Sequence, residues 1–169
     1  MEFGTSQRFT TAQIAALKQT PYWAQLPALR AYARAQWEAT QYVLERSGRK
    51  DVELYRGVSL PEEQVAAGQP RPADGGTRLE ALDFRPGSLS SWSVHQKVGR
   101  EFAASVGGAG KRPVMLRARV PAEAVFSLPN QQRRWIGAAD ELGESIVLGS
   151  GWSGAEAWLD EAPSFKSVG

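Results

Sequence analysis

The chain has 169 residues, of which 42% are hydrophobic and 22% charged, and its formal net charge is +2. This size predicts one domain with its own core, and the mild charge selects no partner. Because there is no cysteine and a single histidine, His95, disulfides, thiolate metal sites and multi-histidine metal centres are excluded. No run approaches the ~20 apolar residues of a membrane span, so we expect a soluble protein with no membrane partner.

Residues 1–6 read like a cloning scar, and we therefore take 7–169 as a single domain. Its helical part is expected at about 10–48 and its β-rich part at about 52–160.

Two helices are predicted in the N-terminal third. The first covers 10–18 with Thr10 or Thr11 as its cap, and Pro27 suits the first turn of a longer helix that runs toward Gly48. Apolar residues recur at intervals of three and four along the longer helix, which predicts one buried face. That face comprises Ala28, Tyr32, Ala35, Ala39, Tyr42 and Val43.

After the helices the sequence changes to short β-rich segments. Residues 52–58 alternate in polarity and contain β-formers, which predicts a strand that ends at Gly57. Ser59 is expected to cap a short helix that begins at Pro61, and the Gly/Pro-rich run 68–76 is expected to be a surface loop.

One more helix is predicted among the remaining strands. It covers 95–106 with Ser93 as its cap, and His95 in its first turn is interpreted as a solvated or capping residue. The strands are expected at 79–84, 88–94, 114–120, 124–128, 145–149 and 155–159, with a polar loop at 129–143. Helices followed by many short strands predict an α+β fold with a mostly antiparallel sheet or pair of sheets.

Three segments stand out when they are taken together. They are LYRGV, which places Arg56 on the first strand, SLSSWS at 88–93 with REFA at 100–103 in the following helix, and ELGESIVL at 141–148. In order, spacing and local structure they resemble the mono-ADP-ribosyltransferases of the Arg-Ser-Glu type, the class of cholera toxin and the bacterial exoenzymes. The resemblance covers roughly residues 52–159.

The resemblance implies an ADP-ribosyltransferase-like fold, in which N-terminal helices pack on two small, mostly antiparallel sheets around an NAD cleft. It implies a glycosyltransferase that splits NAD and passes ADP-ribose to a macromolecule, with NAD as a substrate and without a metal. Related domains often are bacterial or phage toxin or effector modules. The resemblance therefore also implies secretion or injection, action in a target-cell cytoplasm, and a cognate immunity protein in the producing cell.

Arginine suits the pyrophosphate of NAD, because its guanidinium fork binds phosphate oxygens in a bidentate way. Arg56 is the candidate, and Gly57 allows close approach of the backbone. Ser91 and Ser93 lie two apart on a strand and point to one face, whereas Trp92 points to the other, toward the core. By resemblance the first serine supports the cleft and the catalytic carboxylate, so Arg56 and Ser91 join the catalytic set. The cofactor-binding set is Tyr55, Arg56, Gly57, Ser91, Trp92, Ser93 and Phe102.

A fixed carboxylate is the third requirement, because cleavage of the nicotinamide–ribose bond leaves positive charge on the ribose. Family members place the catalytic glutamate second in a Glu-x-Glu or Gln-x-Glu pair, directly before an apolar strand. We favour Glu144 as the catalyst, so that Leu142 occupies the usual target-selecting position, and Glu141 is the reserve candidate. In the alternative alignment Glu144 is the first member and Ile146 replaces the catalyst, which predicts a degenerate enzyme.

The loop before this strand occupies the position where relatives recognise their targets. It combines amide, cationic and aromatic groups, which suit a protein patch or a nucleic-acid backbone with a stacked base. The acceptor therefore stays open between a protein and RNA or DNA. The expected recognition residues are Gln131, Gln132, Arg133, Arg134, Trp135, Glu141 and Leu142.

Two other functions fit the same sequence. An NAD glycohydrolase on the same fold would use water as the acceptor, and a catalytically degenerate relative would bind a partner through the loop. A plain RNA-binding module is disfavoured, because the sequence lacks the aromatic and basic strand motifs of the common families.

Overall fold

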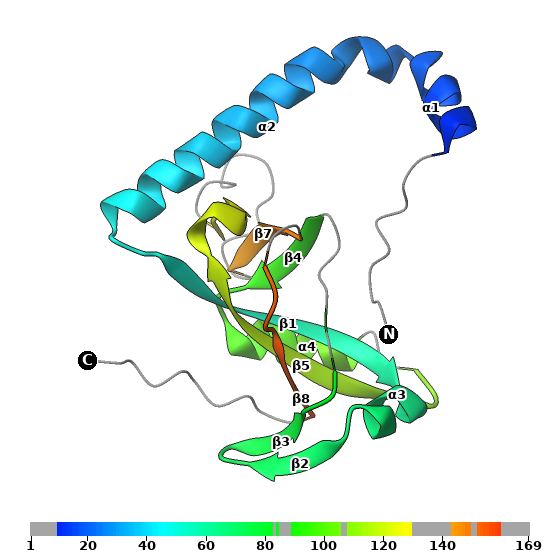
Figure 1. The fold of residues 1–169 in the computed structure, drawn as a ribbon, viewed down its shortest axis with the longest axis vertical. Coiled ribbons are helices and arrows are strands. Elements are labelled where there is room, and N and C mark those ends of the chain that lie inside the picture. Colours follow the sequence, from blue (N-terminus) through cyan, green and yellow to red (C-terminus); the bar gives the residue numbers. More distant parts are fainter. Residues whose placement is uncertain are drawn as a thin grey trace.

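The computed structural model describes residues 10–82, 84, 89–105, 108–129, 143–149 and 152–159. These residues form an α+β fold, as the order of elements predicts (Figure 1). The helices are α1 (Thr11–Lys18), α2 (Pro21–Arg46), α3 (Glu62–Ala67), α4 (Gln96–Ser105) and the 3-10 helix η1 (Ala122–Ala124). The strands are β1 (Asp51–Pro61), β2 (Pro70–Ala73), β3 (Gly76–Leu79), β4 (Leu89–Ser93), β5 (Lys111–Pro121), β6 (Val125–Ser127), β7 (Glu144–Leu148) and β8 (Glu156–Trp158).

The strands make one antiparallel sheet in the order β2-β3-β8-β5-β1-β4-β7-β6. β1 and β5 form its centre and pair along their whole length. β1 and β4, by contrast, form a strand pair only at Tyr55 and Ser93. The two small sheets expected from the sequence are therefore one sheet, whose halves are joined by this single residue pair.

The main core lies against one face of this sheet. Alternate residues of β1 and β5, such as Leu54 and Leu116, are fully buried in it because successive side chains of a strand point to opposite faces. Trp92 on β4 joins this core, and its ring lies edge-on to Phe84 and Trp152 at centroid separations of 6.1 and 5.7 Å. Trp92 thus points into the core, as the alternation along its strand predicts.

The long helix α2 docks on one end of the sheet through polar side chains rather than through the predicted apolar face. Trp37, Thr40 and Gln41 donate hydrogen bonds of 2.9 to 3.1 Å to backbone carbonyls of η1 and β6. The six residues of the predicted face are all exposed, Tyr32 by 63% and Tyr42 by 59%. The prediction of a buried face there is wrong, because the hydrogen bonds to the carbonyls of η1 and β6 and the burial of Leu44 in the main core set the rotation of the helix.

The two N-terminal helices begin in different ways. Thr10 caps α1, where its side chain accepts from the Gln13 backbone in a capping box, as predicted. α2 begins at Pro21 instead of Pro27, and Pro27 lies inside the helix. Both prolines follow the sequence pattern of a first turn, but only Pro21 stands where a missing N–H costs no helical hydrogen bond.

A β-hairpin replaces the predicted surface loop at 68–76. β2 and β3 pair across a turn at Asp74 and Gly75, and the φ of 94° at Gly75 is favourable only for glycine. β2 lies at the edge of the sheet, where Pro70 and Pro72 can be accommodated without breaking a ladder on the outer side. The glycines and prolines of residues 68–76 therefore belong to a hairpin at the edge of the sheet.

Two other predicted boundaries are wrong. β1 continues past Gly57, so Ser59 does not cap α3 and instead donates to a carbonyl of α4 at 3.2 Å. The predicted strand at 79–84 stops at Leu79, because the chain turns there and the Ala81 N–H bonds the carbonyl of Gly68 at 3.0 Å.

A buried ion pair ties β8 to β5. Arg117 is only 6% exposed, its Nε donates to Glu156 at 3.0 Å, and its guanidinium lies 5.4 Å from the ring centroid of Trp158. We expect Glu156→Gln to lower the free energy of unfolding by about 3 kcal/mol, because the buried guanidinium of Arg117 would lose the negative charge of the carboxylate that it contacts.

Urea unfolding measures this change. Glu80→Gln is the matched control, because Glu80 pairs with Arg71 at 3.2 Å on the surface, with both side chains about half exposed or more. The control should change the free energy of unfolding by less than about 1 kcal/mol. Equal effects of the two substitutions would contradict a stabilising role for the buried pair.

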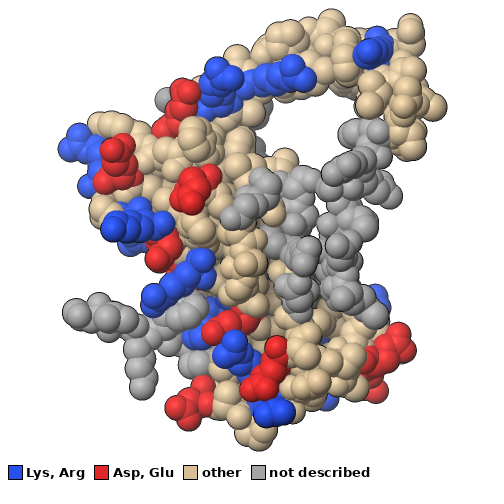
Figure 2. Space-filling model, viewed as in Figure 1, with Lys and Arg blue, Asp and Glu red and all other residues tan. Residues whose placement is uncertain are grey.

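Charge is mixed on the face shown in Figure 2, where basic and acidic side chains alternate over the body of the protein. On this face no single sign of charge marks a partner surface. No helix in the described part of the chain is both long and apolar enough to span a membrane.

Candidate functional site

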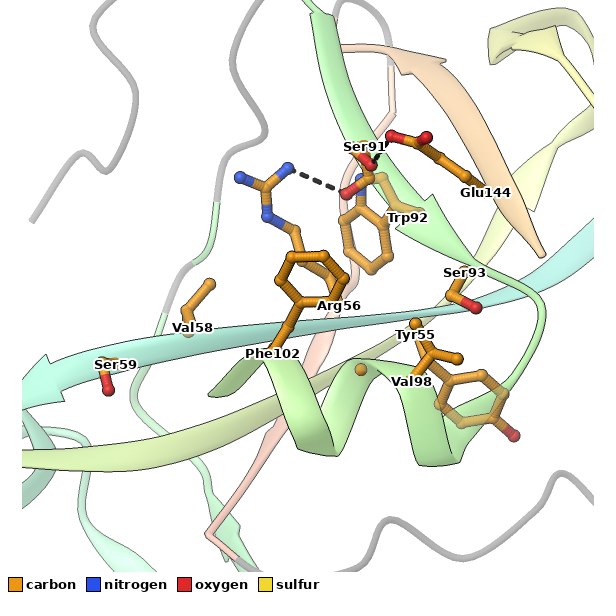
Figure 3. A pocket seen from close by; sticks show the side chains of 12 residues that line it. Tyr55, Arg56, Val58, Ser59, Ser91, Trp92, Ser93, Val98, Phe102 and Glu144 are labelled. Carbon is orange, nitrogen blue, oxygen red and sulfur yellow. Dashed lines mark hydrogen bonds between the residues drawn. The ribbon is translucent and has the colours of Figure 1, made fainter. Parts of the chain in front are cut away.

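A pocket of about 410 Å³ opens where β1 and β4 diverge, and α4 forms one of its walls (Figure 3). This volume is typical of a small-molecule site. All seven residues of the predicted cofactor-binding set line it, and so does Glu144. Residues far apart in the sequence, on β1, β4, α4 and β7, therefore share one cavity.

A close contact between β1 and α4 shapes the pocket. A Cβ at Gly57 would lie 1.9 Å from the Gly99 carbonyl oxygen and 2.3 Å from the Ala103 nitrogen, so no larger residue fits. Gly57 was predicted to allow close approach of the backbone at the phosphate-binding site, but the neighbour that approaches it is helix α4. This approach brings Val98 and Phe102 into the pocket.

We expect Gly57→Ala to push α4 away from β1 and to lower the free energy of unfolding by about 3 kcal/mol, because the clash is with backbone atoms that cannot rotate away. Thermal unfolding measures this effect, and Gly108→Ala is the control, since nothing lies within 4 Å of a Cβ there. A Gly57→Ala protein as stable as the control variant would show that the contact is not rigid.

Arg56 is half-buried and lies on one side of the pocket. Its Nη1 donates to the backbone carbonyl of Ser91 at 3.1 Å (Figure 3). Burial lowers the pKa of the Arg56 guanidinium because desolvation disfavours the charged form, although an arginine stays protonated in proteins. Within the described residues no carboxylate forms an ion pair with Arg56. The pocket therefore contains a partly desolvated cation with room for an anion.

Glu144 stands on the other side of the pocket and is held by Ser91. The Ser91 Oγ donates to Glu144 Oε1 across β4 and β7 (Figure 3). Ser93 lies directly opposite Glu144 in the register, so both serines and the carboxylate share one face of the sheet. The Ser93 Oγ accepts from the His95 N–H at 2.9 Å, in the turn directly before α4 begins at Gln96.

The register also places the residue of the alternative alignment. Ile146 lies opposite Ser91 and on the same face as Glu144. The candidate positions of both alignments, 144 and 146, therefore lie on one face of the sheet. The carboxylate of Glu144 contacts the Ser91 hydroxyl. The reserve candidate Glu141 and Leu142 lie outside the described residues, and so do the predicted recognition residues Gln131, Gln132, Arg133, Arg134 and Trp135.

The other members of the cofactor-binding set differ in what they offer. Phe102 is 50% exposed and stands at the pocket with its ring open to a ligand (Figure 3). Trp92 lines the pocket but is buried in the core. The Tyr55 hydroxyl donates to Glu53 and points away from Arg56 (Figure 3). Only Phe102 of these three presents a free ring to the cavity.

The sequence interpretation missed four lining residues. Val58 and Ser59 follow on β1, and Val98 and Gly99 lie on α4. A signal for Val98 was present, because it stands four residues before Phe102 on a helix and so shares its face. Val98 was nevertheless interpreted as packing only, because the sequence does not show that the helix face borders a cavity.

Comparisons with protein-family models, with curated proteins and with solved structures find no match to this chain. Among the residues that the structure describes, no group of three or more imidazoles and carboxylates gathers where it could hold a metal ion.

Proposed function

We propose that the protein is an NAD-dependent mono-ADP-ribosyltransferase with an ADP-ribosyltransferase-like fold, in which the pocket binds NAD. The observation that carries the proposal is the pairing of opposite charges across one cavity. Arg56 on β1 forms no ion pair with a carboxylate among the described residues, and the carboxylate of Glu144 on β7 is oriented by Ser91. A dinucleotide that is anionic at its pyrophosphate and becomes cationic at its ribose matches this arrangement.

In this proposal the guanidinium of Arg56 binds the pyrophosphate. It is partly desolvated, and no carboxylate of the described part of the chain forms an ion pair with it. Phe102, Val58 and Val98 supply an apolar surface for the flat nicotinamide ring. The ribose between these groups then lies beside Glu144. A fixed carboxylate can accept hydrogen bonds from the hydroxyls of this ribose.

The reaction breaks the bond between the ribose C1′ and the nicotinamide nitrogen, and the bonding electron pair leaves with nicotinamide. Glu144 stabilises the resulting oxocarbenium charge, and Ser91 restrains the carboxylate by its hydrogen bond. A nucleophile of the acceptor then bonds to C1′ and gives up its proton. We further propose that the acceptor is a macromolecule and that the domain acts as a toxin or effector.

Three measurements test the proposal. Calorimetry with NAD should show binding to the pocket, and the protein should release nicotinamide from NAD. Incubation with labelled NAD and a cell lysate should then label a macromolecule, and digestion with protease or nuclease identifies its class. Absence of both binding and nicotinamide release in a folded protein would overturn the proposal, whereas nicotinamide release with no labelled macromolecule would identify a glycohydrolase.

A further inference from the structure

The turn that precedes Glu144 is tightly enclosed. Gly143 is buried, has a φ of +56°, and its carbonyl accepts from the Val94 N–H at 3.0 Å. A Cβ at Gly143 would lie 2.5 Å from Cδ2 and 2.9 Å from Nε2 of His95, and 2.7 Å from Cγ2 of Val94. The imidazole of His95 therefore lies directly against Gly143 and occupies the space that a side chain at position 143 would need.

The contacts of His95 join two parts of the site. Its backbone N–H bonds the Ser93 hydroxyl at 2.9 Å, and Ser93 pairs with Glu144 in the register. Its ring packs on Gly143, the residue that leads into Glu144. The side chain remains exposed to solvent and is absent from the residues that line the pocket. Burial in the core or contact with a ligand in the pocket thus does not account for its position.

We propose that His95 is a positioning residue for Glu144, and that the volume of its ring, rather than its proton, performs this role. The ring holds the left-handed turn at Gly143 and so sets where β7 begins and where the Glu144 carboxylate points. Gly143 has no side chain, so the contact of the ring with this residue is packing. This inference rests on the proposed function of Glu144.

The size of the effect follows from the geometry of catalysis. A carboxylate that stabilises a developing charge must lie close to it, and a misplacement of about 1 Å can cost on the order of a hundredfold in rate. Ser91 would still bind the Glu144 carboxylate if the ring were lost. We therefore expect a partial loss of rate, about tenfold, with the binding of NAD unchanged.

The experiment compares His95→Ala with His95→Phe in the release of nicotinamide from NAD. His95→Ala should lower kcat about tenfold and leave KM within about twofold. His95→Phe, which keeps a flat ring, should keep kcat within about twofold and keep the pH profile of the wild type. Lys97→Ala is the control, because Lys97 is exposed in the first turn of α4 and borders neither the pocket nor Gly143.

Full activity of His95→Ala overturns the inference. A loss of rate in His95→Phe equal to that in His95→Ala also overturns it and assigns the imidazole to proton transfer instead.

A second readout separates this inference from the proposed function. Amide NMR shifts of residues 143–145 should move in His95→Ala and stay near their wild-type values in His95→Phe. If the wild type neither binds nor cleaves NAD while these shifts behave as expected, the proposed function fails and the packing of His95 on Gly143 stands. If the wild type cleaves NAD and the shifts do not move in His95→Ala, the inference about His95 fails and the proposed function stands.

Discussion

Glu144→Gln should lower the rate of nicotinamide release from NAD about a thousandfold while leaving the fold and the affinity for NAD nearly unchanged. Glutamine keeps the size of the side chain and can still accept a hydrogen bond from Ser91, but it lacks the negative charge that stabilises the ribose cation. The loss should therefore appear in kcat and not in KM. Steady-state kinetics of nicotinamide release, with calorimetry of NAD binding, separate the two quantities.

Glu101→Gln is the matched control for this substitution. Glu101 lies on α4 near the pocket wall, is exposed, and pairs only with Lys97 at 3.8 Å among the described residues. Its replacement should leave the rate within about twofold. Retention of the full rate by Glu144→Gln would transfer the catalytic role to another carboxylate, for which Glu141→Gln is then the next variant to measure.

Arg56→Ala should raise the dissociation constant for NAD by a factor of about 30 or more. A charge-assisted hydrogen bond to phosphate contributes roughly 1.5 to 3 kcal/mol, and the burial of Arg56 places it toward the upper end of that range. Arg56→Lys should recover only part of the affinity, because lysine keeps the charge but lacks the bidentate fork. Calorimetric titration with NAD gives these dissociation constants.

Two comparisons make the result specific to Arg56. Arg112→Ala removes an exposed arginine of β5 that does not line the pocket, and it should leave the dissociation constant within about twofold. Nicotinamide alone lacks phosphate, so its weak binding should not depend on Arg56. Equal losses of affinity for nicotinamide and for NAD in Arg56→Ala would mean that the substitution damages the pocket as a whole rather than a phosphate contact.

The two variants test different ends of one cavity. Arg56 acts on the intact dinucleotide, so its loss should raise the dissociation constant, whereas Glu144 acts on the charge that develops during cleavage, so its loss should lower kcat. Opposite assignments, with Arg56 affecting only rate and Glu144 only affinity, would reverse the orientation of NAD in the pocket.

Local sequence determined those features whose causes lie within a few residues. The capping box of Thr10 and Gln13 specifies the start of α1, and the two-residue alternation on β4 directs Ser91 and Ser93 to one face and Trp92 to the other. The α+β fold followed from the order of such segments. Local periodicity sets which residues share a face, so these predictions needed no knowledge of distant parts of the chain.

Only the tertiary structure decided which part of the protein, or solvent, each face of a helix or strand contacts. The apolar stripe of α2 is exposed because hydrogen bonds from Trp37, Thr40 and Gln41 to carbonyls of η1 and β6 set the rotation of the helix. In the same way, the close contact of Gly57 with α4 and the packing of His95 on Gly143 join residues more than forty positions apart. Such contacts depend on which surfaces come together when the chain folds, and neither propensity nor periodicity in a single segment encodes that choice.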